Sequence, residues 1–195
     1  MKKAILISIQ PKYVRKILLG EKTLEIRKTK PKEFGKLFFN DSDEPIDVYI
    51  YCTKNKGKKN YLSKVMTDLS NNELVDEIKL NGRVVAKFAL NKVEKICPRD
   101  YISLSGHRTE TLSHNDLLQK SCLTSEELGK YLKGNGYAWH IDNLEIFGKP
   151  KELREFNSTK GFTTCEHCLF DIKTCNCEHC NSLTRAPQSW CYIEV

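Results

Sequence analysis

The chain has 195 residues, of which 39% are hydrophobic and 29% are charged, enough for one sizeable core and an ordinary polar surface. No stretch approaches the roughly 18 uncharged apolar residues of a membrane helix, and the apolar run at residues 4–9 is too short for a signal peptide. We therefore expect a cytoplasmic protein without membrane contacts.

The net charge of +7 is concentrated in the N-terminal part of the chain. Residues 1–60 contain 15 Lys and Arg against 7 Asp and Glu, whereas the rest of the chain contains 17 against 18. A basic segment beside a neutral one favours an anionic partner, and nucleic acid is a common one. The alternative is that the lysine-rich loops are ordinary solvated surface.

The first half of the chain predicts strands and one clear helix. Residues 4–9 form the apolar run of a buried strand, and Pro11 suits the first turn of a helix that Gly20 ends. Alternation over residues 24–28, and the β-branched and aromatic side chains of residues 47–52, predict two more strands. Residues 53–60 predict an exposed loop, and residues 62–80 predict a helix in part.

The second half predicts longer strands and two short helices. Alternating apolar side chains predict one strand over residues 82–96. Ser113 and Thr124 are expected to be helix N-caps, the second in a capping box with Glu127. Residues 137–147 and 189–195 predict the last strands. Since strands and helices do not alternate, we expect one α+β domain over residues 1–195, a small and mostly antiparallel β-barrel with flanking short helices.

The nine cysteines are unevenly spaced. Four of them form two Cys-x-x-Cys pairs with zinc-knuckle spacing: Cys165, Cys168, Cys177 and Cys180. Three neighbours are alternatives to one of these ligands: His167, Cys175 and His179. Four thiolates leave no open coordination position, so the pattern predicts a structural Zn²⁺ ion in a zinc-knuckle insertion over residues 157–184. The scattered cysteines are expected to be small buried apolar residues: Cys52, Cys97, Cys122 and Cys191.

A charged motif, Gly20-x-Lys22-x-x-Glu25-x-Arg27, joins the predicted helix to the next strand. On a strand, Glu25 and Arg27 share one face, and Lys22 can lean over the same area from the turn. A carboxylate between two cations suits recognition of a phosphate and a base edge, or acid–base catalysis. The plainer alternative is a solvated strand face.

This motif, after the strand and helix that precede it, resembles the signature of ASCH domains, which belong to the PUA-like superfamily. Residues 137–141 and 186–192 resemble the closing strands of bacterial and phage members. The resemblance implies a β-barrel with a cleft lined by the motif, and RNA binding. Relatives include an amidohydrolase acting on acetylated cytidine and enzymes that cleave RNA. The amidohydrolase pattern has a Thr nucleophile where this chain has Glu25.

Three functions remain as alternatives. The first is an RNA-binding module with these contact residues: Lys22, Glu25, Arg27, Lys28, Lys30, Trp139 and Tyr192. The second is a hydrolase acting on RNA, a ribonuclease, or on a modified nucleoside, with Lys22 and Glu25 as its catalytic residues. The third is a protein-interaction module such as a transcriptional coregulator, with a protein partner. The zinc ion is expected to be structural in each of them.

Overall fold

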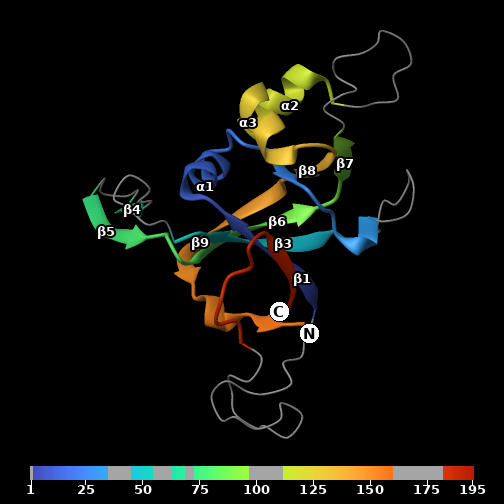
Figure 1. The fold of residues 1–195 in the computed structure, drawn as a ribbon. Coiled ribbons are helices and arrows are strands. Elements are labelled where there is room, and N and C mark those ends of the chain that lie inside the picture. Colours follow the sequence, from blue (N-terminus) through green and yellow to red (C-terminus); the bar gives the residue numbers. More distant parts are fainter. Residues whose placement is uncertain (1, 35–44, 55–62, 69–72, 97–111, 160–181) are drawn as a thin grey trace, which may run out of the picture. The chain divides into compact units, whose positions relative to one another are not determined.

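The computed structural model describes residues 2–34, 45–54, 63–68, 73–96, 112–159 and 182–195. These residues form three α-helices and sheets of six, three and two strands (Figure 1). The chain divides into two compact units. The first unit comprises Met1–Val14, Asp47–Lys87 and Glu145–Val195, and the second comprises Arg15–Ile46 and Phe88–Leu144.

The six-stranded sheet is built chiefly from the first unit, in the order β10-β11-β1-β3-β6-β9. The strands are β1 (Lys3–Ile9), β3 (Ile46–Cys52), β6 (Val84–Leu90), β9 (Asp142–Lys151), β10 (Asn157–Ser158) and β11 (Trp190–Glu194). Strand β1 pairs parallel with β3 and antiparallel with β11. Its side chains are buried from Ala4 onward, which explains the continuous apolar run, because a central strand is covered on both faces.

The core of the first unit lies against this sheet. Tyr49 and Tyr51 of β3 pack there with Phe156, which follows the 3₁₀ helix η3 (Leu153–Glu155). The Cys52 thiol at the end of β3 is fully buried, and burial raises its pKa to about 12. Cys52 is thus the small apolar residue that was predicted, whereas Cys122 and Cys191 are only partly buried and Cys97 lies outside the described residues.

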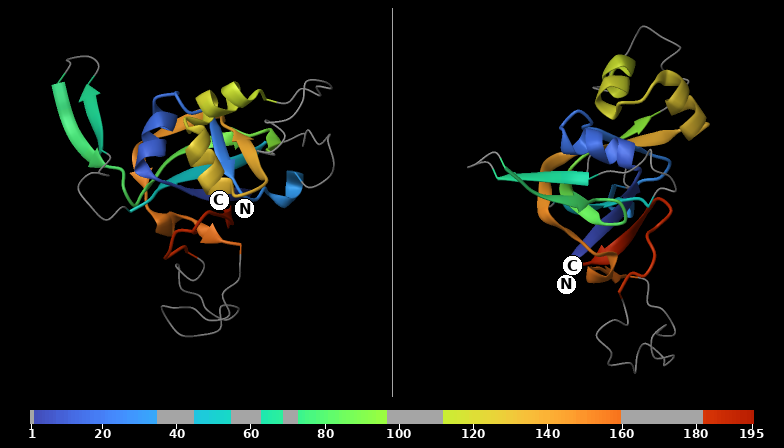
Figure 2. Two further views of the ribbon diagram at one scale, coloured as in Figure 1. Left: turned by 45° about the horizontal axis from the view of Figure 1, so that its top comes forward. Right: turned by 90° about the vertical axis from the view of Figure 1, so that its left-hand side faces the viewer.

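The second unit contains the three-stranded sheet, in the order β2-β8-β7. Its strands are β2 (Leu24–Arg27), β7 (Val93–Ile96) and β8 (Gly136–His140). Helices α2 (His114–Ser121) and α3 (Ser125–Leu132) cover one face (Figure 2). Leu117 and Leu128 of these helices pack there against Leu24 and Ile26 of β2. This small core holds β2, the strand of the charged motif, in a fixed position.

The helix signals of the sequence are confirmed. Helix α1 spans Pro11–Leu18, close to its predicted range. Ser113 accepts a hydrogen bond from the Asp116 amide, and Thr124 forms the predicted capping box with Glu127. Both motifs satisfy amide groups that a helix leaves without a partner at its start. No helix among the described residues is long and apolar enough to cross a membrane.

Three predicted elements were wrong in type or extent. Residues 62–80 contain an antiparallel strand pair, β4 (Ser63–Asp68) and β5 (Glu73–Lys79), and not a helix. The predicted strand at 82–96 is divided into β6 and β7, and the one at 137–147 into β8 and β9. In both cases the two halves belong to different sheets. A period of two shows that a segment is extended, but it does not show where the chain leaves one sheet for another.

The predicted barrel also requires correction. The described strands form open sheets and not a closed barrel, although their pairing is mostly antiparallel and the fold is α+β as expected. The chain leaves one sheet for the other near Asn91, between β6 and β7, and at Ile141, between β8 and β9. The strands expected to form one barrel therefore belong to two sheets. Strand β9 tolerates Pro150 because it lies at an edge, where one side of the strand needs no ladder hydrogen bonds.

Candidate functional site

The turn between α1 and β2 places Lys22. Gly20 has a φ of +74°, a left-handed conformation that glycine adopts without strain. The Gly20 amide donates to the Ile17 carbonyl, and the amides of Glu21 and Lys22 both donate to the Lys16 carbonyl. This is the hydrogen-bond pattern of a Schellman C-cap. The helix therefore ends at a defined residue, and the chain enters β2 with Lys22 directed into the unit.

Lys22 is almost completely buried, with an exposed fraction of 3%. Its Nζ atom donates hydrogen bonds to the carbonyl oxygens of Leu24, at 2.7 Å, and Ser121, at 2.8 Å. It also lies 3.3 Å from Oε2 of Glu25. Two carbonyls and a carboxylate require three donors, and only the charged ammonium group provides three. The two hydrogen bonds and the ion pair fix the position of the Lys22 Nζ atom.

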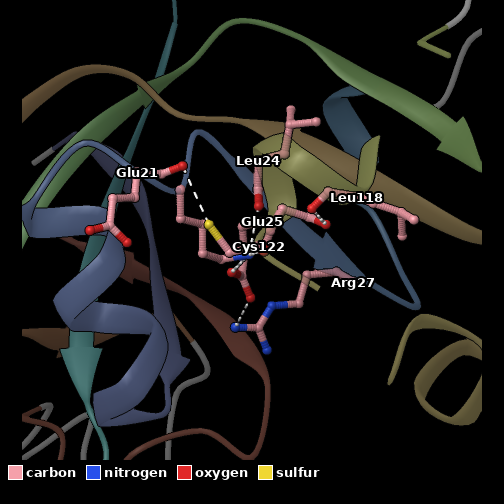
Figure 3. A network of polar contacts seen from close by, with 8 residues as sticks. Glu21, Leu24, Glu25, Arg27, Leu118 and Cys122 are labelled. Atoms are coloured by element: carbon pink, nitrogen blue, oxygen red, sulfur yellow. Dashed lines mark hydrogen bonds and ion pairs between the residues drawn. The ribbon is translucent and has the colours of Figure 1, made fainter. Parts of the chain in front are cut away.

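Glu25 is held between two cations. Its Oε2 faces Lys22, while its Oε1 accepts from Nη2 of Arg27 at 2.8 Å (Figure 3). All three side chains are at least nine-tenths buried, so water screens the charges little. Two cations and one carboxylate leave the group with a formal charge of +1. The structure brings together the three motif residues as predicted, but as a buried network and not as a solvated strand face.

The register of β2 with β8 completes one face of the network. Glu25 lies opposite Trp139, and Arg27 lies opposite Tyr137. The Trp139 side chain is completely buried, so in this structure it forms a wall beside the carboxylate and offers no open face to a base. Tyr137 is partly exposed. Of the two rings, therefore, only Tyr137 has accessible surface for stacking.

The C-terminal end of helix α2 makes two hydrogen bonds with the motif segment that the sequence did not indicate. Its last residue, Ser121, supplies a carbonyl to Lys22. The next residue, Cys122, is the C-cap with a φ of +53°, and its thiol donates to the Glu21 carbonyl at 3.4 Å (Figure 3). Carbonyl groups at a helix C-terminus lack partners within the helix, and they carry partial negative charge. The buried ammonium of Lys22 satisfies one of them.

A second residue that sequence reasoning missed is Tyr131 on α3. Burial raises the pKa of its hydroxyl, Glu25 raises it further, and the charge and hydrogen bond of Arg27 act in the opposite direction. Tyr131 therefore lies at the outer end of the network and has an exposed fraction of 38%. Tyr131 follows Leu128 by three residues in the helix, and this spacing does not predict the contact. The contact depends on how α3 packs on β2.

Two lysines follow the network in the chain, directly after β2. The exposed Lys28 places its Nζ atom 5.4 Å from the centre of the Tyr131 ring, and Lys30 lies 5.5 Å from the centre of the Tyr137 ring. Lys30 also donates to the Phe34 carbonyl. Cations at this distance over an aromatic face are attracted to it, which orders otherwise flexible side chains. Lysines and partly exposed rings therefore alternate at the end of β2.

Another polar cluster of the second unit lies on β7 and β8. Glu94 accepts from His140 Nε2 at 2.9 Å and from Lys92 at 2.7 Å. Burial by itself raises the pKa of Glu94, but its contacts with Lys92 and His140 outweigh burial and lower the pKa below its usual value. The cluster joins the two strands at their ends, where the His140 amide also bonds to the Lys92 carbonyl.

The remaining predicted residues lie elsewhere. Tyr192 belongs to the first unit, where the Lys3 ammonium lies 3.8 Å from its ring centre and Trp190 packs edge-on against it. The four predicted zinc ligands lie outside the described residues: Cys165, Cys168, Cys177 and Cys180. The alternatives His167, Cys175 and His179 do so as well. Within the described part of the chain, no group of three or more potential ligands could hold a metal ion.

No protein-family model matches the chain, and no curated protein resembles it in sequence. Solved structures do resemble it in fold. ASCH from Zymomonas mobilis has 14% sequence identity and a TM-score of 0.51, over 98% of this chain and 87% of that one. A single-residue mutant of ZmASCH from the same organism has 13% identity and a TM-score of 0.53, over 98% and 88% of the chains. A second mutant has 13% identity and a TM-score of 0.51, over 99% and 91%.

The chain therefore has the fold of an ASCH domain. This confirms the resemblance to ASCH domains, although the described strands do not form the closed barrel that it implied. Because the sequence identity is low, this similarity concerns the fold alone.

Proposed function

We propose that the protein is an RNA-binding module of the ASCH type, which contacts RNA around the end of β2. The observation that carries this proposal is the buried network of Lys22, Glu25 and Arg27, which is followed directly by Lys28 and Lys30 over tyrosine rings. The network holds the strand, and the lysines and rings make the contacts.

The exposed groups match the two chemical elements of single-stranded RNA. Lysine ammonium groups attract phosphates without regard to sequence. Partly exposed aromatic rings offer a face or an edge on which unpaired bases stack. Lys28 with Tyr131, and Lys30 with Tyr137, pair one group of each kind. The ASCH fold adds to this argument, since the resemblance stated above implies RNA binding.

The buried residues have a different task in this proposal. Lys22 donates to two carbonyls and pairs with Glu25, so it orients Glu25 and does not itself need to reach a phosphate. Glu25 in turn pairs with the guanidinium of Arg27. Arg27 forms a hydrogen bond with the hydroxyl of Tyr131, which is partly exposed. The formal charge of +1 on the buried group adds to the positive potential at the end of the strand.

Charge removal tests this proposal. In the double variant Lys28→Gln/Lys30→Gln, we expect weaker binding of end-labelled single-stranded RNA, measured by fluorescence anisotropy at several salt concentrations. Loss of two phosphate contacts should reduce the slope of log K against log salt by about 1.4. The matched control is Arg15→Gln/Lys120→Gln, which removes two exposed cations of the same unit. Equal losses in both double variants, or no RNA binding by the wild type, would contradict the proposal.

A hydrolase acting on RNA is the second candidate, and one observation favours it. The Glu25 carboxylate is held in one orientation by two cations, as an acid–base group requires. Lys22 would then act through its positive charge, since its Nζ atom already donates to two carbonyls and pairs with Glu25. Discrete products on a denaturing gel that disappear in Glu25→Gln would support this candidate over simple binding.

The zinc knuckle remains a proposal from cysteine spacing, and one feature of the first unit supports it. Asn157 forms an antiparallel bridge with Ser182, and the Leu183 amide donates to the Phe156 carbonyl at 2.9 Å. The two ends of the predicted insertion therefore meet, as they must for a compact metal-held loop.

Elemental mass spectrometry tests the zinc site. We expect about one zinc ion per wild-type chain, because two Cys-x-x-Cys pairs supply one tetrahedral set. Cys165→Ser/Cys177→Ser should lose most of the metal, while the control Cys191→Ser should keep it. A wild-type protein that contains no zinc after expression with added zinc would exclude the site.

A further inference from the structure

The first unit contains a cavity that the proposed function does not use. Its volume is about 400 Å³. Four segments supply the wall: the end of β3, the turn before β6, the 3₁₀ helix η3, and residues 183–186. All of these segments belong to the first unit and are among the described residues. A cavity of this size fits a small molecule.

The charges on the wall are unbalanced. Three basic side chains line the cavity: Lys54, Arg154 and Arg185. None of them forms an ion pair or a side-chain hydrogen bond with any residue that the structure describes. Among the described residues of the wall the one acidic side chain is Glu152, which is paired with Arg83. Three cations without a carboxylate partner in the described part of the wall favour an anion that carries more than one negative charge.

Lys54 is held in place by its contact with Gly82. Gly82 has a φ of +81°, and a Cβ atom there would lie 2.8 Å from Cε and 3.0 Å from Cγ of Lys54. The lysine stem thus packs directly on the glycine. The Gly82 amide donates to the Cys52 carbonyl at 2.7 Å, and the Thr53 amide donates to the Ile9 carbonyl at 2.9 Å. These bonds hold the glycine and Thr53, the residue before the lysine, at the cavity.

The rest of the wall is apolar or hydroxylic. Leu153, Leu183 and Ala186 line it together with the Tyr51 ring and Thr184. Tyr51 and Leu183 also belong to the core of the unit, so this part of the wall is rigid. The basic side chains of the wall suit a compact, multiply charged anion, and its apolar side chains suit a planar or apolar group of the same ligand. A phosphate group accepts hydrogen bonds from several Arg and Lys donors at once.

We propose that this cavity binds a phosphate monoester of about the size of a mononucleotide, with its phosphate held by Lys54, Arg154 and Arg185. The proposal goes beyond RNA binding at β2, because it concerns other residues in the other unit. The same chemistry occurs in a free nucleotide and at the phosphorylated end of an RNA chain, so the experiment must separate these two sources.

Isothermal titration calorimetry on the full chain provides the test, with AMP, adenosine and inorganic phosphate as probes. We expect saturable binding of one AMP per chain, with adenosine at least about tenfold weaker because it lacks the charged group. Arg154→Gln and Arg185→Gln should each weaken AMP binding about tenfold. Both residues are exposed, so folding should be unaffected. The control Lys149→Gln removes an exposed lysine of the same unit that does not line the cavity.

Two further arms identify the source of the ligand and separate the two sites. Competition of AMP with a 5′-phosphorylated RNA, but not with its 5′-hydroxyl counterpart, would assign the cavity to RNA ends; AMP binding without such competition would assign it to a free nucleotide. Lys28→Gln/Lys30→Gln should leave AMP binding unchanged. Failure of AMP to bind saturably, equal affinity for adenosine, or wild-type affinity in both arginine variants would overturn this proposal without affecting RNA binding at β2.

Discussion

Replacing Lys22 by methionine is expected to lower the free energy of unfolding by about 3–5 kcal/mol, because it removes one partner of a buried ion pair. The ammonium satisfies the carbonyls of Leu24 and Ser121 as well as the Glu25 carboxylate. Methionine fills a similar volume but donates no hydrogen bond, so these acceptors lose their partner in the interior. Urea denaturation monitored by circular dichroism measures the loss.

A control and a double variant make this result specific. Lys95→Met changes an exposed lysine of β7 in the same way, and its effect should stay within about 0.5 kcal/mol. In Lys22→Met/Glu25→Gln the carboxylate is removed together with its cation, so the combined loss should be smaller than the sum of the two single losses. A loss below about 1 kcal/mol for Lys22→Met would show that the network does not stabilise the fold.

The second large effect is expected for Trp139→Ala, with a loss of about 3–5 kcal/mol in the free energy of unfolding. The indole is completely buried in the central strand of its sheet, directly opposite Glu25. Its removal leaves a cavity beside the carboxylate. Thermal denaturation measures the stability, and RNA anisotropy should show weaker binding at a temperature where the variant is folded.

Trp190→Ala is the matched control, since this chain has two tryptophans and Trp190 is only partly buried on β11. A smaller loss of stability is expected there, because less apolar surface leaves water when this side chain packs. If both variants lose the same stability, the special position of Trp139 beside the network is not supported.

Much of the local structure could be predicted because its signals lie within a few residues of one another. Thr124 and Glu127 are three residues apart and form their capping box inside one helical turn. Gly20 ends α1 by the hydrogen bonds of the same turn. Residues 62–80 illustrate the limit. They were predicted to be helical in part, but their backbone groups pair across two strands, and such pairing between segments leaves a weak signal in local periodicity.

The candidate site was predictable in composition but not in burial. The spacing of Glu25 and Arg27 on one strand face is a property of the extended backbone, so their proximity followed from the sequence. Whether that face meets water or protein depends on what packs over it. The structure buries all four residues of β2, and it adds Tyr131 from a helix about a hundred residues further along the chain.

The sequence by itself determined the motif of Lys22, Glu25 and Arg27, the helix caps and the ASCH resemblance, because each depends on residues close together in the chain. The tertiary structure alone decided the rest. The Ser121 carbonyl that holds Lys22 is 99 residues away, and the cations of the cavity come from three separate segments. Burial and charge pairing arise where such distant segments pack, and packing depends on the whole chain and not on local pattern.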